Sequence, residues 1–230
     1  MRKCVLVLLA FVASWSTLYA QDDESSSGGG GFFDAGDLAF EITGSPFSRD
    51  LPNSTDGTFL SFGSFRARYA VTTNIVPRLG INMDLYNNQV SPDVVVNSSM
   101  YTLMPGCEYH FRIENGFRSY AALDLLIGQQ FASLESTTQS NVNGATSVPS
   151  SSSDYYTGDR GYFMFGVGAG VGADYHFSSN FYIGAEIGFR LAQYKWSDIE
   201  VDGELFQEGV QTSVGSINTM NSIRIGFKFL

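Results

Sequence analysis

The chain has 230 residues and a formal net charge of −10, from 13 Lys and Arg against 23 Asp and Glu. A chain of this length suits a single all-β domain. The acidic balance argues against a nucleic-acid partner, because such binding depends on basic side chains that neutralise phosphates. Beyond its first residues the sequence holds no apolar stretch long enough for a transmembrane helix, which excludes that kind of membrane span.

Residues 1–20 are predicted to be a signal peptide and not part of the fold. Arg2 and Lys3 give a charged start, an apolar run follows, and Ala20 supplies the small residue that a cleavage site needs. The Ser- and Gly-rich residues 21–37 are predicted to form a flexible periplasmic tail. After cleavage Cys107 would be the only cysteine, so no intrachain disulfide is expected despite export.

Residues 38–230 are predicted to form one domain of eight β-strands, in which apolar and polar residues alternate so that each strand has one apolar face. The predicted strands are residues 38–43, 60–72, 79–86, 101–112, 119–129, 163–177, 181–193 and 221–230. A change of phase at Phe62 predicts a β-bulge in the second strand. In the fourth strand, Pro105 and Gly106 argue against a continuous strand unless they too mark a bulge, because proline is disfavoured inside a closed sheet.

The sixth strand shows the alternation most clearly. One phase of residues 163–177 is entirely apolar, and the other consists of Met164, four glycines, Asp174 and His176. Fifteen residues of this pattern are long for a soluble strand but match a tilted strand that crosses a bilayer. The pattern therefore predicts a transmembrane β-barrel.

The predicted connections alternate in length, as an outer-membrane barrel requires. Residues 74–78, 113–116 and 178–180 form short turns, whereas the connections after the first, third, fifth and seventh strands are long and polar. The longest covers residues 131–161, and its Ser- and Asn-rich part, residues 133–154, is predicted to be a flexible cover or a variable surface for recognition. An even strand count places both termini on the periplasmic side.

A soluble calyx also alternates, but its polar face turns to water and should be rich in Lys, Glu, Thr and Ser. Here the polar face carries many glycines instead, including Gly168, Gly184 and Gly226. Because an eight-stranded barrel is only wide enough for side chains to fill, some strands must supply small residues to its interior. The glycines favour the membrane barrel over the calyx.

The polar face also carries charges of both signs, which are expected to pair in the lumen because an unpaired buried charge is costly. The predicted lumen network consists of Glu41, Arg66, Arg68, Asp84, Glu108, Asp124, Asp174, Glu186, Arg190 and Arg224. It can be a structural plug that fixes the register of the barrel, or the lining of a gated or ion-selective pore. The small diameter favours the plug.

The end of the chain, residues 223–230, alternates apolar residues and closes on aromatic ones, and so resembles the C-terminal signal of bacterial outer-membrane proteins. It departs from that signal in one respect, since Phe229 is penultimate and Leu230 is last. Together with the predicted leader and loops, the chain resembles the small eight-stranded OmpA-type and OmpX-type barrels. The resemblance implies an all-β, eight-stranded antiparallel up-and-down transmembrane β-barrel in the bacterial outer membrane. Its implied partners are the bilayer, lipopolysaccharide and, through Phe227 and Phe229, the outer-membrane assembly machinery.

An enzymatic role is the weakest of three expectations. His110 and His176 are the only histidines, and both are predicted near periplasmic turns, whereas resembling barrel enzymes place their histidine near the outer surface. No catalytic residue, metal ligand or cofactor is predicted. Residues 198–209 depart from a calcium loop, and Asp202-Gly203 is predicted instead to be the turn of an acidic hairpin. A weak divalent-cation or lipopolysaccharide contact at this hairpin is a further hypothesis.

The sequence thus predicts a non-enzymatic barrel with a plugged lumen and a structural or surface-interaction role through its long loops. The first alternative is a narrow diffusion channel for ions or very small solutes, and the second is a lipid-modifying enzyme.

Overall fold

The computed structural model describes residues 34–46, 60–114, 116–148 and 160–229. The predicted signal peptide and most of the predicted tail lie outside these ranges. The strands are β1 (Leu38–Pro46), β2 (Leu60–Tyr69), β3 (Ile75–Ser91), β4 (Val94–Glu114), β5 (Phe117–Ser136), β6 (Val142–Asn143), β7 (Tyr162–His176), β8 (Phe181–Trp196), β9 (Ile199–Val201), β10 (Glu204–Gln207) and β11 (Gln211–Phe229). Within the described part of the chain, no helix is long and apolar enough to cross a membrane.

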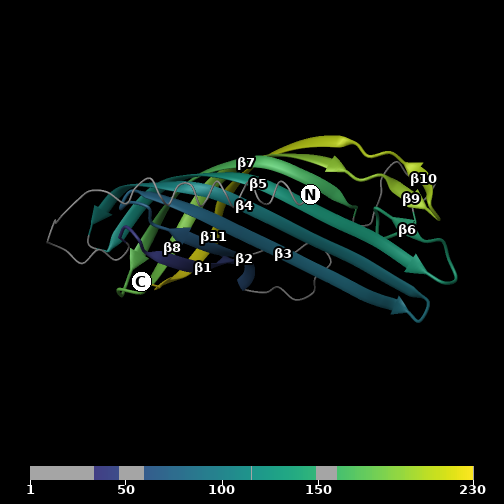
Figure 1. The fold of residues 1–230 in the computed structure, drawn as a ribbon, viewed down its shortest axis with the longest axis horizontal. Helices are drawn as coiled ribbons and strands as arrows, with labels where there is room; N and C mark the ends of the chain where they lie inside the picture. The colour runs from purple at the N-terminus through teal and green to yellow at the C-terminus, as the bar shows by residue number, and fades with distance from the viewer. Residues whose placement is uncertain (1–33, 47–59, 115, 149–159, 230) are drawn as a thin grey trace. The chain divides into compact units, whose positions relative to one another are not determined.

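Eight of these strands close into a ring, with every neighbouring pair antiparallel (Figure 1). The order around the ring is β5, β4, β3, β2, β1, β11, β8 and β7, and β7 pairs back onto β5. The eight strands are those predicted from the alternation, and most are longer than predicted. The eight-stranded antiparallel barrel is therefore confirmed.

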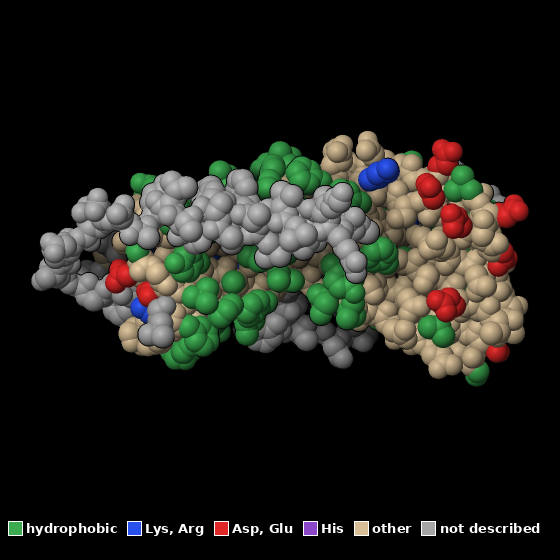
Figure 2. Space-filling model, in the orientation of Figure 1, with side chains coloured by type: hydrophobic (Ala, Val, Ile, Leu, Met, Phe, Trp, Pro, Cys, Tyr) green, Lys and Arg blue, Asp and Glu red, His purple; other side chains and the backbone are tan. Residues whose placement is uncertain are grey.

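The surface of the ring is inverted relative to that of a soluble protein. On β7, Phe163, Phe165 and Val167 are 45%, 49% and 46% exposed, whereas the intervening Met164, Gly166 and Gly168 are buried. Figure 2 shows hydrophobic side chains gathered over the ring strands and acidic ones gathered at the end where Figure 1 places β9 and β10. Exposed apolar side chains around buried polar ones are typical of a barrel that faces lipid.

Two segments predicted as loops are instead partly strand. Residues 87–100 form a hairpin with a turn at Pro92-Asp93, because Val94, Val95 and Val96 favour an extended chain and pair with β3. The predicted loop 131–161 is also wrong in part, because β5 continues to Ser136 and β6 pairs with both β5 and β9. Residues 149–159 of this loop lie outside the described part of the chain.

The ordered part of that loop has an apolar core of its own. Leu134, Val142, Ala145 and Ile199 are all at most 8% exposed, and they pack together beside three half-buried valines. The predicted acidic hairpin is confirmed as β9 and β10, with Asp202 and Gly203 at φ values of 52° and 85° as a type I′ turn requires. The outer ends of β4 and β5 therefore continue into a small sheet rather than into irregular loops.

The two irregularities predicted within strands have different outcomes. The β1–β2 register shifts between Thr43 and Gly44, opposite Phe62 and Ser64, which confirms the predicted bulge. At Pro105 there is no bulge, since the β4–β5 register is the same at Leu103 and at Gly106. Proline has no N–H to donate, so the ladder is interrupted locally without a shift.

Candidate functional site

A cluster of charged side chains fills the middle of the ring. Nine residues in described ion pairs come from all eight ring strands: Glu41 from β1, Arg66 and Arg68 from β2, Arg78 from β3, Glu108 from β4, Asp124 from β5, Asp174 from β7, Glu186 from β8 and Arg224 from β11. Each occupies the inward phase of its strand, opposite the exposed apolar phase. We call these nine residues the ion-pair cluster.

Arg68 lies at the centre of one half of the ion-pair cluster. Its Nη1 donates to Glu41 Oε1 and to Asp174 Oδ2, at 2.8 Å in each case, and its Nη2 donates to Glu108 Oε2. The Arg68 and Glu41 side chains are 1% and 0% exposed. One guanidinium therefore joins three strands that are not neighbours of one another in the ring, across the interior.

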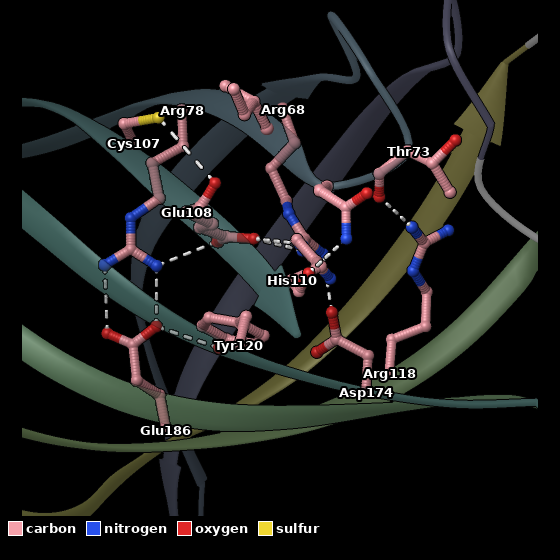
Figure 3. Close-up of polar contacts among 12 residues, drawn as sticks. Arg68, Thr73, Arg78, Cys107, Glu108, His110, Arg118, Tyr120, Asp174 and Glu186 are labelled. Carbon is pink, nitrogen blue, oxygen red and sulfur yellow. Dashed lines mark hydrogen bonds and ion pairs between the residues drawn. The ribbon is translucent and has the colours of Figure 1, made fainter. Parts of the chain in front are cut away.

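Arg78 organises the other half (Figure 3). Its Nε donates to Asp124 Oδ1 at 2.7 Å, and its Nη1 donates to Glu108 Oε1 at 2.8 Å and to Glu186 Oε2 at 2.7 Å. Because Glu108 contacts both Arg68 and Arg78, it links the two halves. A planar guanidinium with five donors suits such multiple carboxylate contacts.

Arg224 and Arg66 are the other two arginines of the ion-pair cluster. Arg224 Nη2 donates to Asp174 Oδ1 at 2.5 Å, and Arg66 Nη1 lies 3.6 Å from both Glu41 and Glu186. Four arginines thus face five carboxylates among the described ion pairs. Buried charges are costly unless they are paired and hydrogen-bonded, and this cluster meets both conditions for most of its members.

Two tyrosines extend the cluster toward the barrel wall. Tyr182 Oη donates to Glu41 Oε1 at 2.8 Å, and Tyr120 Oη donates to Glu186 Oε2 at 3.0 Å. Each ring lies against a strand glycine: a Cβ at Gly226 would overlap the Tyr182 ring, and one at Gly172 would overlap the Tyr120 hydroxyl. Because Gly172 and Gly226 have no side chain, they leave the space that these two aromatic rings occupy.

The variant Gly172→Ala is expected to lower the free energy of unfolding by about 1–3 kcal/mol, as overpacking a filled interior does. Gly168→Ala, four residues earlier on β7, is the matched control, because its Cβ would meet no atom closer than 3.8 Å. Urea unfolding of both variants in detergent micelles measures the difference. Equal stability of the two variants would show that Tyr120 does not occupy the space beside Gly172.

Sequence reasoning missed several residues of the interior. Arg78 was predicted to lie in a turn, yet β3 begins at Ile75 and places Arg78 in the ion-pair cluster. His110 Nε2 lies 3.0 Å from Glu108 Oε2, and Arg118 Nη2 donates to the Thr73 carbonyl at 2.6 Å. The signal that could have found Arg78 was its phase, which continues through Gly80 and Asn82 on the polar face of β3.

Two residues of the predicted lumen network lie apart from the cluster. Asp84 and Arg190 share the inward phase of β3 and β8 but are exposed, and neither makes an ion pair within the described residues. The other eight predicted residues are all members of the ion-pair cluster. The alternation along each strand therefore predicted which residues face the interior, but not at which level along the barrel axis the charges meet.

The site consists of buried charges that are paired with charges of the opposite sign. The Nε2 atom of His110 lies 3.0 Å from Glu108 Oε2 and 3.3 Å from Arg68 Nη2, so the histidine is part of the same charge network. Within the described residues, no group of three His, Cys, Asp or Glu side chains is arranged to hold a metal ion. What the geometry can do is tie eight strands together and occupy the space between them.

The fold and its inverted surface define an integral barrel of the bacterial outer membrane. A family model described as "Outer membrane protein beta-barrel domain" matches residues 5–215, and the chain belongs to this family.

Solved structures of outer-membrane proteins resemble the chain at low identity. Ail, the attachment invasion locus protein of Yersinia pestis, is 16% identical, with 85% of this chain and 99% of that chain covered and a TM-score of 0.41. OprG from Pseudomonas aeruginosa is 14% identical, with 86% and 97% covered and a TM-score of 0.43. No curated protein matches the chain.

Proposed function

We propose that this protein is a sealed, non-enzymatic outer-membrane barrel that acts as a structural element of the envelope. It presents for surface interaction the small sheet formed by the outer ends of β4 and β5 with β6, β9 and β10, which we call the outer sheet. The observation that carries the proposal is the ion-pair cluster, whose arginines Arg68, Arg78 and Arg224 have side chains at most 1% exposed. Side chains this inaccessible to solvent support a lumen filled by protein atoms. Charges paired across the ring also fix the register of all eight strands.

The same proposal covers the ends of the chain. Residues 1–20 are removed on export, residues 21–37 lie in the periplasm, and the assembly machinery recognises Phe227 and Phe229 on β11. In support, Phe229 is 49% exposed, and its ring lies 4.5 Å from that of Phe227. Asp37 Oδ2 lies 3.0 Å from Lys228 Nζ, so the residue just before β1 is paired with the C-terminal strand.

Single-channel recording in planar bilayers tests whether the lumen is closed. The inserted native protein is expected to be silent, and the double variant Arg78→Ser/Glu186→Ser is expected to show discrete conductance steps. This variant removes one positive and one negative charge together with the side-chain volume that lies between β3 and β8.

The matched control is Asp84→Ser/Arg190→Ser, which removes the same charges from exposed inward positions. It should remain as silent as the native protein. Steps from the native protein itself would instead make it a narrow diffusion channel, with the ion-pair cluster as its selectivity region.

A further inference from the structure

The outer sheet holds a cavity that is lined by none of the residues of the ion-pair cluster. Its volume is about 450 Å³, and its walls come from β4, β5, β6, β9 and the segments beside them. Small-molecule sites in proteins typically occupy about 300–1,000 Å³, so the space suits a compact ligand. Figure 1 shows β6 and β9 at the end of the barrel away from the C-terminus.

The walls offer a particular set of polar groups. The lining residues Asn97, Gln130 and Asn143 carry amides, Ser133 carries a hydroxyl, and Asp198 and Glu200 carry carboxylates. Some of these groups already pair: Asn143 Nδ2 donates to Glu200 Oε2 at 3.2 Å, and Gln130 Nε2 donates to Ser98 Oγ at 3.3 Å, which leaves the other carboxylate and amide oxygens as acceptors for a ligand. Amides both donate and accept hydrogen bonds and carboxylates accept them, which matches a ligand with many hydroxyl groups. Phe131, which is 59% exposed, adds an apolar surface to the lining.

Charge narrows the ligand class further. Among the residues that the structure describes, two carboxylates and no Lys or Arg line the cavity, which disfavours phosphate and other anions. Arg160, next to Gly161 in the chain, donates instead to the backbone carbonyls of Ser197 and Glu208, at 3.0 Å in each case. The charge pattern therefore favours a neutral or positively charged ligand.

Backbone hydrogen bonds hold the walls in place. Gly144 N–H donates to Ala132 O, and Gly161 N–H donates to Gly144 O, both at 2.9 Å. Gly144 has a φ of 85°, and a Cβ there would overlap the Asp198 carbonyl, so glycine is required where β6 approaches this wall. The apolar core of Leu134, Val142, Ala145 and Ile199 packs within the same small sheet. A preformed site loses less conformational freedom on binding.

We infer that this cavity binds one neutral or amino-sugar unit of a glycan. The inference rests on the proposed surface-interaction role and names the ligand class of that role. The glycan can come from lipopolysaccharide of the same membrane or from another surface, because the recognised chemistry is the same.

Trp196 provides the readout, since it directly precedes Ser197 in the cavity wall. In a Trp15→Phe background it is the only tryptophan, whether or not the leader is removed. Titration of the purified protein in phospholipid vesicles with glucosamine or glucose is expected to change its emission. Glucosamine should bind more tightly, and glucose 6-phosphate should bind at least about tenfold more weakly than glucose.

Two variants test the location. Ser133→Tyr fills the cavity and should abolish the response to both sugars, whereas Ser213→Tyr, at an exposed position on β11 outside the lining, should leave it unchanged. Glu200→Gln should remove the preference for glucosamine over glucose. An equal loss in both tyrosine variants, or no response to either sugar, would overturn the inference. A response to Ca²⁺ alone would overturn it in favour of a cation site.

Vesicles that contain lipopolysaccharide separate the two sources. If the soluble sugars no longer bind there, the glycan of the same membrane occupies the cavity. If they still bind, the ligand comes from another surface. The sugar titrations and the conductance recordings fail independently. If no sugar binds but the barrel stays silent, only the glycan site is contradicted. If the barrel conducts but binds sugar, only the sealed lumen is contradicted.

Discussion

Replacement of Arg68 by methionine is expected to lower the free energy of unfolding by about 3–5 kcal/mol, the range for removing one partner of a buried ion pair. The variant would leave Glu41, Glu108 and Asp174 without the guanidinium that joins them. In the interior these carboxylates cannot recover their hydration, so the loss exceeds that of the hydrogen bonds alone. Equilibrium urea unfolding in detergent micelles measures the change.

Arg190→Met is the matched control, since Arg190 has the same inward phase on β8 but is exposed. Its expected effect stays within about 0.5 kcal/mol, as for surface substitutions in general. A similar loss of stability in both variants would mean that position on the polar face, and not membership of the ion-pair cluster, determines the cost.

The second large effect concerns the outer face of the ring. Leu123→Arg is expected to cost about 2–4 kcal/mol, the range for arginine facing lipid near the middle of the bilayer. Leu123 is 68% exposed and lies between the exposed Phe117 and Phe131 on β5. In a protein surrounded by water, a leucine this exposed would tolerate the substitution with little change.

Leu205→Arg provides the comparison, because Leu205 is 58% exposed but lies in the β9–β10 hairpin, outside the ring. Both variants are refolded into phospholipid vesicles over a urea gradient. The account predicts a near-native midpoint for Leu205→Arg and a clear shift for Leu123→Arg. Equal midpoints would contradict the assignment of Leu123 to the lipid face.

The strands of the barrel could be predicted because their signal is local. Alternation along residues 163–177 requires knowledge only of neighbouring residues, and the same holds for the turn at Asp202-Gly203. The apolar phase also revealed which face would turn outward. These features are present in the sequence wherever the strand lies in the ring.

The membership of the ion-pair cluster depends on distant parts of the chain. Asp84 and Arg190 have the same phase as Glu186, but strands in a barrel are tilted and staggered, so height cannot be read from phase alone. Arg78 was assigned to the short connection of residues 74–78, whereas pairing of Ile75 with Tyr109 starts β3 before it. The stagger is set by closure of the whole ring.

The outer sheet was the largest error, and its cause is also nonlocal. Residues 133–148 are polar enough to suggest an irregular loop, but Val142 and Ala145 pack against Ile199, more than fifty residues away in the chain. This contact orders β6 between β5 and β9. Composition of the loop alone could not reveal a partner in another loop.

The central claim is that the ion-pair cluster closes the lumen to solvent, and chemical modification of arginine tests it most directly. The native protein in vesicles is treated with phenylglyoxal, and the modified positions are identified by mass spectrometry. The account predicts that exposed Arg190 reacts, while Arg68, Arg78 and Arg224 stay unmodified until the barrel is unfolded. Modification of all four at comparable rates in the folded protein would contradict a closed lumen.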